Sequence, residues 1–373
     1  MKILIDARFT RTDHHDGISR YGASLIAAAS KIADVSMLIS DIRQLALLPD
    51  VPYTLINSPL SPAELFVARK INPLGADVVV CPMQTMGTLG RKYGLVLTLH
   101  DLIYYEHPAP PGFLPAPVRL LWRLYHRAYW PQRLLLNRAD VVATISRTTE
   151  ALMVKYRLTR RPVRIISNAP QPAQEPRTPE AGAKPCLVYM GSFMPYKNVE
   201  TMVAGMAGLP GFTLHLLSRI TPQRRAELEK LIPPGAKVEF HNGVTDEEYA
   251  TFLETATALV SLSRAEGYGL PLVEAMSLGT PVIASDIPIF REVGGDAASY
   301  VDPASPQQFA DAVKKLDDRE RWEETSRRSV ARAREFSWEE SARQLVDVAH
   351  DIVAQRRGKM TQRRGKLNSG RGK

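Results

Sequence analysis

Strand-like and helix-like segments alternate along most of this 373-residue chain, and this alternation limits its fold more than any other feature. Short runs of Val, Ile and Leu are typical of strands buried on both faces, and several are separated by segments with helical periodicity. Because parallel strands are joined by crossover helices, the pattern predicts an α/β architecture with parallel sheets. The predicted strands are 3–5, 35–39, 78–80, 95–99, 141–145, 163–166, 186–190, 213–217, 238–240, 258–262, 281–284 and 298–301.

A proline-rich stretch divides this series into two halves. Residues 169–185 contain five prolines without apolar periodicity, which predicts an exposed connection between two domains. A chain of this length is also too long for one ordinary core. Helices are predicted over 18–32, over 117–136 and from 306 to about 354. The predicted organisation is a first domain over 1–168, the linker over 169–185, a second domain over 186–337, a terminal helix over 338–355 and a disordered basic tail over 356–373.

The most specific motif is Ser-Arg-Ala-Glu-Gly-Tyr-Gly-Leu-Pro-Leu-Val-Glu-Ala-Met, at residues 263–276. It follows a predicted buried strand and leads into an apolar helix. Gly267 and Gly269 let the backbone turn tightly and bring N–H groups close to an anion at the helix start. Glu266 is predicted to lie beside the ligand. Glu274, on the first turns of the helix, can accept hydrogen bonds from a polyol.

This block resembles the donor-binding motif of retaining family 4 glycosyltransferases of the GT-B fold, and the resemblance extends from the first strand to about Arg334. It implies two Rossmann-like, doubly wound domains that face a central cleft. It also implies that Glu266 meets the transferred sugar and that Glu274 binds the ribose of a nucleotide sugar. The other donor-binding candidates of the block are Arg264, Gly267, Tyr268, Gly269 and Leu270.

A lysine after the first strand of the second domain is a second candidate. Lys197, in the string Met190-Gly-Ser-Phe-Met-Pro-Tyr-Lys-Asn198, can present an ammonium to the charge that develops on a leaving diphosphate. The resembled family commonly has an Arg–Lys pair in this loop. Lys197 matches the lysine, but Ser192 stands where the arginine is usual, and Arg264 or Arg219 are alternative sources of that charge.

The first domain contributes candidates at two predicted loops. Gly17 opens a helix after the first strand and its loop, where a diphosphate can bind at the helix N-terminus. In the resembled family, a Gly-Ile-x-Arg-Tyr string here recurs in a subset that often includes mannosyltransferases. His100 and Asp101 follow the predicted strand 95–99, so we expect His100 to touch the sugar or the acceptor and Asp101 to orient nearby groups.

The function expected from these residues is transfer of a hexose, with mannose favoured, from a nucleotide sugar to a glycan or lipid-linked acceptor. GDP-mannose is the favoured donor and a UDP-sugar the alternative. The sequence has no Asp-x-Asp motif and no His/Cys cluster at metal-ligand spacing, so we expect neither a metal nor a cofactor. The resemblance implies same-face substitution, in which the leaving phosphate helps to deprotonate the acceptor. A nucleotide-sugar 2-epimerase on a similar double fold and a non-catalytic sugar-binding remnant remain as alternatives.

The formal net charge of +9 is mostly a property of the C-terminus, because residues 356–373 contain eight Lys or Arg and no acid. The tail lacks aromatic residues and any recognisable module, so specific nucleic-acid binding is not expected. A second basic cluster consists of Arg119, Arg123 and Arg127, spaced by four and interleaved with apolar residues. It is interpreted either as a helix packed on the core of its domain, which we favour, or as an amphipathic helix on an anionic membrane.

The compartment expected from the sequence is the cytoplasm, with a peripheral position at the inner face of the plasma membrane as an option. Cys81 and Cys186 lie far apart in strand-like runs, as expected for buried thiols and not for a disulfide framework. No apolar run approaches the roughly 20 residues needed to span a bilayer.

Overall fold

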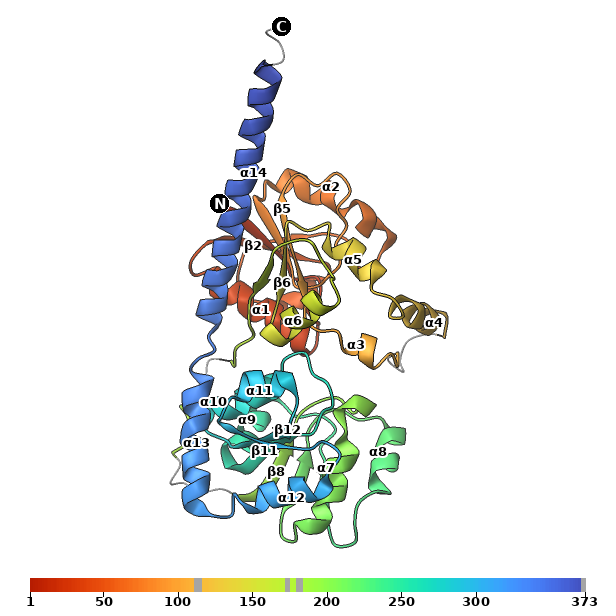
Figure 1. The fold of residues 1–373 in the computed structure, drawn as a ribbon, viewed down its shortest axis with the longest axis vertical. Coiled ribbons are helices and arrows are strands. Elements are labelled where there is room, and N and C mark those ends of the chain that lie inside the picture. Colours follow the sequence, from red (N-terminus) through yellow and green to blue (C-terminus); the bar gives the residue numbers. More distant parts are fainter. Residues whose placement is uncertain (111–115, 172–174, 179–183, 370–373) are drawn as a thin grey trace. The chain divides into compact units, whose positions relative to one another are not determined.

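The computed structural model describes residues 1–110, 116–171, 175–178 and 184–369, with side chains to residue 358. The chain forms two compact units (Figure 1). Unit 1 consists of residues 1–168 and 338–373, and unit 2 of residues 169–337. Each contains one sheet whose strand pairings are all parallel, as the alternating sequence pattern predicts.

The sheet of unit 1 has seven strands in the order β3-β2-β1-β4-β5-β6-β7, so the chain winds outward from β1 in both directions. Strands β4 and β5 lie at its centre and every residue of both is buried, which explains their uninterrupted apolar sequences. Strand β3 is absent from the predicted strands, because three residues at a sheet edge show no recognisable periodicity. The strands are β1 Lys2–Asp6, β2 Asp34–Ile39, β3 Tyr53–Leu55, β4 Val78–Cys81, β5 Gly94–Leu99, β6 Val141–Thr144 and β7 Val163–Ile165.

The helix predicted over 117–136 in unit 1 forms two helices instead of one. Pro131 lies in the first turn of the second helix, where its missing N–H and fixed φ are tolerated, so the chain breaks before it. The helices are α1 Gly17–Ala29, α2 Val67–Ile71, α3 Ile103–Glu106, α4 Ala116–Tyr125, α5 Trp130–Leu136, α6 Arg147–Lys155 and α14 Trp338–Ser369, with short 3-10 turns at Ile42–Leu47, Pro62–Phe66 and Asn72–Leu74.

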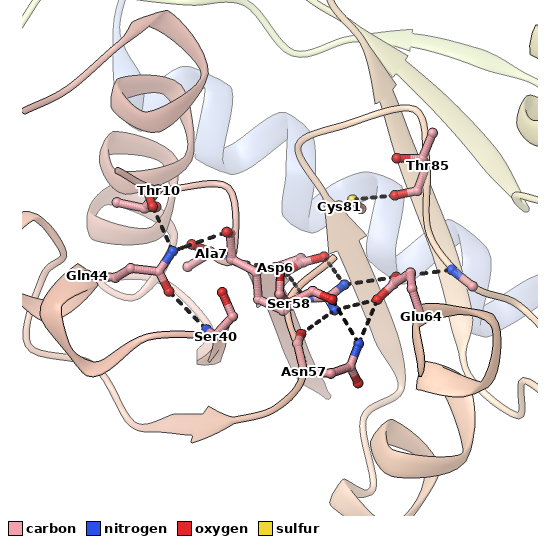
Figure 2. A network of polar contacts seen from close by, with 12 residues as sticks. Asp6, Ala7, Thr10, Ser40, Gln44, Asn57, Ser58, Glu64, Cys81 and Thr85 are labelled. Atoms are coloured by element: carbon pink, nitrogen blue, oxygen red, sulfur yellow. Dashed lines mark hydrogen bonds and ion pairs between the residues drawn. The ribbon is translucent and has the colours of Figure 1, made fainter. Parts of the chain in front are cut away.

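A buried ion triad closes the carboxyl end of β1 (Figure 2). The Arg8 guanidinium donates to both carboxylate oxygens of Asp6 at 2.8 Å and to Glu64 Oε2 at 2.6 Å. The side chains of Asp6 and Arg8 are fully buried. Burial by itself lowers the pKa of Arg8, but its hydrogen bonds and ion pairs with the two carboxylates raise it overall. The triad therefore fixes the loop after β1 to the segment that precedes α2.

Helix α14 packs along unit 1 beside α1 (Figure 1). Ser341 Oγ donates to Ser167 O at 2.8 Å, and the Trp338 ring meets Tyr21 at 5.9 Å. The helix also crosses β5 closely at Gly94, where a Cβ would collide with the Ile352 side chain. The prediction that order ends at residue 355 needs correction, because the backbone stays helical to Ser369. Arg, Lys, Gln and Met are good helix formers and extend the preceding helix; residues 370–373 lie outside the described chain.

Unit 2 holds a six-stranded sheet in the order β10-β9-β8-β11-β12-β13, with β8 and β11 at the centre. Its strands are β8 Lys184–Tyr189, β9 Thr213–Leu216, β10 Lys237–Phe240, β11 Ala256–Ser261, β12 Val282–Ser285 and β13 Ala298–Val301. Its helices are α7 Val199–Gly205, α8 Pro222–Glu229, α9 Asp246–Thr255, α10 Leu270–Ser277, α11 Pro288–Gly294, α12 Pro306–Lys314 and α13 Arg319–Ala333, with 3-10 turns at Pro195–Lys197 and Met206–Gly208.

The predicted linker is only partly an exposed connection. Its residues 172–174 and 179–183 lie outside the described part, and Lys184 and Pro185 already belong to β8. Arg177 is anchored on unit 2, where its guanidinium donates to Ala256 O at 3.1 Å and stacks on the Trp322 ring at 4.2 Å. The linker therefore contains a fixed point that its proline-rich composition does not reveal.

The favoured interpretation of the Arg119–Arg127 cluster is wrong for α4, since none of the residues of this helix is buried. Leu120, Leu121 and Leu124 are 59%, 65% and 51% exposed, and Trp130 at the start of α5 is 65% exposed. The segment therefore presents an apolar and basic surface instead of packing its apolar residues into the core. Among the helices that the structure describes, none is long and apolar enough to cross a bilayer.

Candidate functional site

Two loops at the carboxyl ends of the central strands of unit 2 carry most of the predicted site. One follows β8 and leads to α7, and the other follows β11 and leads to α10. Because β8 and β11 are neighbours in the parallel sheet, the loops leave the same edge side by side. Lys197 lies in the first loop and Glu266 in the second, and the structure brings these two residues into contact.

The Lys197 ammonium and the Glu266 carboxylate form an ion pair, with Nζ 2.5 Å from Oε1. The side chains are only 15% and 13% exposed, so the pair is shielded from most of the solvent. Ser263, which is fully buried, donates its hydroxyl to the same Glu266 oxygen at 2.8 Å. Two donors therefore hold one oxygen of this carboxylate and set its orientation.

The buried side chain of Asn198 fixes the loop that carries Lys197. Its Nδ2 donates to Leu262 O at 2.9 Å and to Pro303 O at 2.6 Å. Its Oδ1 accepts from the Thr201 hydroxyl at 2.9 Å and from Arg264 at 3.2 Å. The residue adopts a left-handed conformation with φ of 56°, which asparagine tolerates better than most residues. One amide thus joins the loops that follow β8, β11 and β13.

Of the two alternative arginines, Arg264 lies nearer to Lys197 along this network. Its backbone N–H donates to Tyr196 O at 2.7 Å, and its guanidinium reaches the oxygen of Asn198 while remaining exposed. Arg219 packs its side chain across Gly243 in the loops after β9 and β10. Ser192 is exposed, and its carbonyl accepts from the Tyr189 hydroxyl at 2.6 Å. The geometry therefore favours Arg264 as the second cation of the loop cluster.

The glycine-rich turn 267–269 presents the start of α10. Gly269 precedes the helix with φ of +96°, and a Cβ there would approach Phe290 to 2.8 Å, so both conformation and space require glycine. Within the described residues, no side chain caps the first turn of α10. Pro271 has no N–H and the Leu272 N–H donates to Gly269 O at 2.9 Å, so the Leu270 N–H is the first-turn donor that suits an anionic ligand.

The remaining motif residues divide by accessibility. Leu270 and Glu274 are half-buried on the first turns of α10, and the Ser277 hydroxyl donates to the Glu274 carbonyl. The Tyr268 side chain, by contrast, is 5% exposed and meets the Phe336 ring edge-on at 6.2 Å. Burial raises the pKa of its hydroxyl. Only the backbone of Tyr268 is therefore suited to contact a ligand, and its ring anchors the turn.

The candidates of unit 1 lie around α1 and the carboxyl end of β5. His100 Nε2 is 2.7 Å from Pro82 O and must donate to it, because a carbonyl only accepts. Burial lowers the pKa of His100, so the ring is neutral at physiological pH, with its lone pair on Nδ1. The ring stacks edge-on against Tyr21 of α1 at 5.0 Å. His100 is therefore suited to accept a hydrogen bond.

Asp101 and the residues around Gly17 already form hydrogen bonds within the protein, which makes them weaker candidates for ligand contacts than His100. The Asp101 carboxylate accepts from the N–H of Ile103, the first residue of α3, at 3.0 Å. At the start of α1, Asp16 accepts from the Ser19 N–H at 2.9 Å and pairs with Arg11 at 2.7 Å. Gly17 itself is exposed, and nothing lies within 4 Å of the position that a Cβ would occupy. There is room for a ligand at Gly17, beside a cap that already uses one N–H.

Sequence reasoning missed Asn198 and Ser263 as site residues. Both lie in the two motifs described above: Asn198 directly follows Lys197, and Ser263 is three residues before Glu266. An asparagine directly before a predicted helix signals a cap or a left-handed turn, but its partners at Leu262 and Pro303 are 64 and 105 residues away. Contacts of that range leave no local signal.

We predict that Asn198→Asp destabilises unit 2. The substitution keeps the shape and tolerance for the left-handed conformation but removes both N–H donors, at a cost of about 1–3 kcal/mol for each buried group left unsatisfied. Asn242→Asp is the matched control, because Asn242 is exposed, has φ of 58° and uses only its oxygen, accepting from Ile220 N–H. Thermal unfolding followed by circular dichroism should show a lower midpoint for Asn198→Asp alone. Equal midpoints for the two variants would contradict the role assigned to Asn198.

Comparison with known proteins places this geometry in a family. Residues 170–336 match the model described as glycosyl transferases group 1, and residues 34–172 match glycosyltransferase family 4. The chain is 24% identical over 324 residues to the O-antigen chain mannosyltransferase RfbU of Salmonella typhimurium, covering 81% of this chain and 87% of that protein. It is 31% identical over 169 residues to the O-antigen chain mannosyltransferase B of Escherichia coli, covering 43% of this chain and 44% of that protein.

Solved structures agree on the fold. Sucrose-phosphate synthase from Thermosynechococcus elongatus superposes with a TM-score of 0.71 at 20% identity, covering 95% of this chain and 99% of that one. Anabaena HepE in complex with UDP-glucose superposes with a TM-score of 0.70 at 17% identity, covering 94% and 100% of the two chains. The matches confirm the family, the fold class and the kind of enzyme expected from the sequence: the chain belongs to glycosyltransferase family 4 and is a hexosyltransferase of the GT-B fold.

Proposed function

We propose that this enzyme transfers mannose from GDP-mannose to a glycan or lipid-linked acceptor, with retention of the anomeric configuration and without a metal ion in the transfer step. The observation that carries the proposal is the Lys197–Glu266 ion pair beside the uncapped start of α10. In a nucleotide sugar, the hexose and the diphosphate are adjacent. A cation for phosphate and a carboxylate for sugar hydroxyls must therefore also be adjacent, as Lys197 and Glu266 are.

The preference for mannose rests on two supports of different kinds. The string Gly17-Ile-Ser-Arg-Tyr21 resembles that of a subset that often includes mannosyltransferases. Relatives named as O-antigen chain mannosyltransferases match this chain at 24% and 31% identity. UDP-glucose, the ligand of the HepE structure, is the competing donor class. O-antigen relatives also favour an acceptor from polysaccharide or glycolipid biosynthesis.

The proposed roles follow from the positions of the side chains. The diphosphate binds the Leu270 N–H at the start of α10 together with Lys197 and Arg264, and these cations stabilise its charge as it leaves. Glu266, released from part of its pairing with Lys197, accepts hydrogen bonds from the hexose, and Glu274 accepts them from the ribose. The bond from the anomeric carbon to the phosphate oxygen breaks as the acceptor hydroxyl oxygen bonds to that carbon from the same face. The hydroxyl proton passes to the departing phosphate.

A panel of sugar nucleotides tests the proposed donor. We expect GDP-mannose to raise the unfolding midpoint and to be consumed, while UDP-glucose and UDP-N-acetylglucosamine have weaker effects.

In Glu274→Ala, loss of a charge-assisted hydrogen bond to the ribose should cost about 1.5–3 kcal/mol, or about 10–150-fold in GDP affinity. Glu247→Ala, an exposed position on α9, is the control and should bind as wild type. A stronger response to a UDP-sugar would overturn the choice of donor, and unchanged affinity in Glu274→Ala would overturn the ribose contact.

A double-mutant experiment separates the structural role of Lys197 from its role in turnover. Lys197→Met leaves the largely buried Glu266 carboxylate without its cation, so both stability and turnover should fall. Adding Glu266→Gln removes the uncompensated charge and should restore the unfolding midpoint but not the rate. Lys197→Arg should keep part of the rate, because either cation can meet phosphate charge although their geometries differ. Wild-type turnover in Lys197→Met would show that the charge on the diphosphate is met elsewhere.

We also propose that the enzyme works on the cytoplasmic face of an anionic membrane. Leu120, Leu121 and Leu124 of α4 are more than half exposed, and Arg123 and Arg127 lie beside them, as in an interfacial helix. The C-terminal segment 356–373 adds eight basic residues, each worth about 1 kcal/mol near an anionic surface. Membrane association would bring a lipid-linked acceptor to the enzyme by a two-dimensional search.

Vesicle flotation separates the two contributions. We expect wild type to float with anionic vesicles at low salt, and a chain ending at Gln355 to float less and with a weaker salt dependence. Replacing Leu120, Leu121 and Leu124 by serine should reduce flotation at both salt concentrations, whereas Leu60→Ser, at a 92% exposed site of unit 1, should not. Absence of wild type from the vesicle fraction at low salt would refute the membrane proposal.

A further inference from the structure

Three potential metal ligands meet at the edge of the unit 2 sheet, on strands β9 and β10 and the residue after β10. His215 Nδ1 lies 3.0 Å from His241 Nε2 and 3.4 Å from Glu239 Oε2, and His241 Nε2 lies 3.9 Å from the same Glu239 oxygen. These three atoms therefore form a small triangle. Residue spacing in the chain does not reveal it, because His215 is 26 residues from His241.

The register of the parallel strands explains why the three side chains converge. Glu239 is the direct partner of His215 in the β9–β10 ladder, so both point to the same face of the sheet. His241 is two residues beyond Glu239 and returns to that face, while its backbone N–H donates to Leu216 O at 3.0 Å. Leu214 and Leu216 point to the opposite face and are fully buried. The backbone thus fixes the positions of all three ligands.

The two histidines of the cluster are mostly buried, whereas the glutamate is exposed to solvent. The His215 and His241 side chains are 14% and 24% exposed, whereas Glu239 is 59% exposed. The Phe252 ring of α9 covers both imidazoles, with centroid distances of 5.1 Å and 4.9 Å. Burial lowers the pKa of His215, which favours the neutral, ligating form of its ring. Solvent can enter beside Glu239.

The spacing suits a transition-metal ion. Ligand bonds of roughly 2.0–2.2 Å in a tetrahedral site separate the ligand atoms by roughly 3.3–3.6 Å, and the three separations here bracket that range. Two imidazoles and one carboxylate suit Zn²⁺, whereas Mg²⁺ and Ca²⁺ prefer oxygen ligands. A metal would also take the place of the proton that must lie between the two nitrogens in the observed ring-to-ring hydrogen bond.

We propose that His215, Glu239 and His241 bind a divalent transition-metal ion of the Zn²⁺ class, with the remaining coordination position left to solvent. Bound there, the ion ties the edge strand β10 to β9 and stabilises unit 2. This site uses none of the residues assigned to sugar transfer, so it is independent of the proposed donor and of the metal-free transfer step. Its ligands come from the two outermost strands on one side of the sheet, which is where unpaired strand edges need protection.

Zinc titration of the full-length, chelator-treated enzyme tests the proposal. Isothermal titration calorimetry should give one Zn²⁺ per chain with micromolar or tighter affinity, and Zn²⁺ but not Mg²⁺ should raise the unfolding midpoint. Glu239→Gln, at an exposed position that folding tolerates, should weaken Zn²⁺ at least about tenfold. His215→Gln with His241→Gln should abolish binding. His350→Gln, an exposed histidine on α14, should bind as wild type.

Co²⁺ provides a readout that does not depend on stability, since its visible absorption bands report ligation by imidazole and carboxylate. We expect these bands in wild type and in His350→Gln, and their loss in the His215/His241 double variant. Zinc binding that persists in the double variant, or no saturable binding to wild type at 10-fold molar excess, would overturn the site and leave the cluster as a hydrogen-bonded pair of imidazoles.

Discussion

The buried amide of Asn198 is the interaction on which the geometry of the loops around Lys197 and Glu266 depends. Parallel strands deliver their loops to one edge of the sheet, but they do not fix the loops against each other. Asn198 does so by donating to carbonyls of the loops after β11 and β13 and by accepting from Arg264. Its left-handed backbone also turns the chain from Lys197 directly into α7. Local conformation and long-range hydrogen bonding thus coincide in one residue.

Lys197 and Glu266 form an ion pair between the loops that Asn198 joins. The two side chains suit different parts of a ligand. In the absence of ligand, each neutralises the other in a site of low exposure, which avoids an uncompensated buried charge. A nucleotide sugar offers phosphate to the ammonium and hydroxyls to the carboxylate. In the proposed donor complex, ligand binding exchanges one set of charge-assisted contacts for another, so the same pair serves stability before binding and recognition after it.

In unit 1, charged side chains also fix a loop. The Arg8 guanidinium joins Asp6 and Glu64 in a buried triad and fixes the first loop of the unit (Figure 2). His100 is held by its bond to Pro82 and its contact with Tyr21, with one ring nitrogen left as an acceptor. Around these fixed points, α4 keeps its leucines on the surface. Rigid polar anchoring and an exposed apolar helix therefore occur in the same unit.

The α/β class, nearly all strands and the glutamate motif could be predicted before the structure, because they depend on local periodicity and on residues close together in the chain. Which side chains meet could be seen only in the folded structure. Asn198 contacts Pro303 across 105 residues, and His215 contacts His241 through strand register. The folded structure also packs Tyr268 inward and leaves the three leucines of α4 exposed. Whether a side chain is buried or paired depends on neighbours that are distant in the sequence and that folding brings together. A local sequence pattern therefore cannot specify burial or pairing.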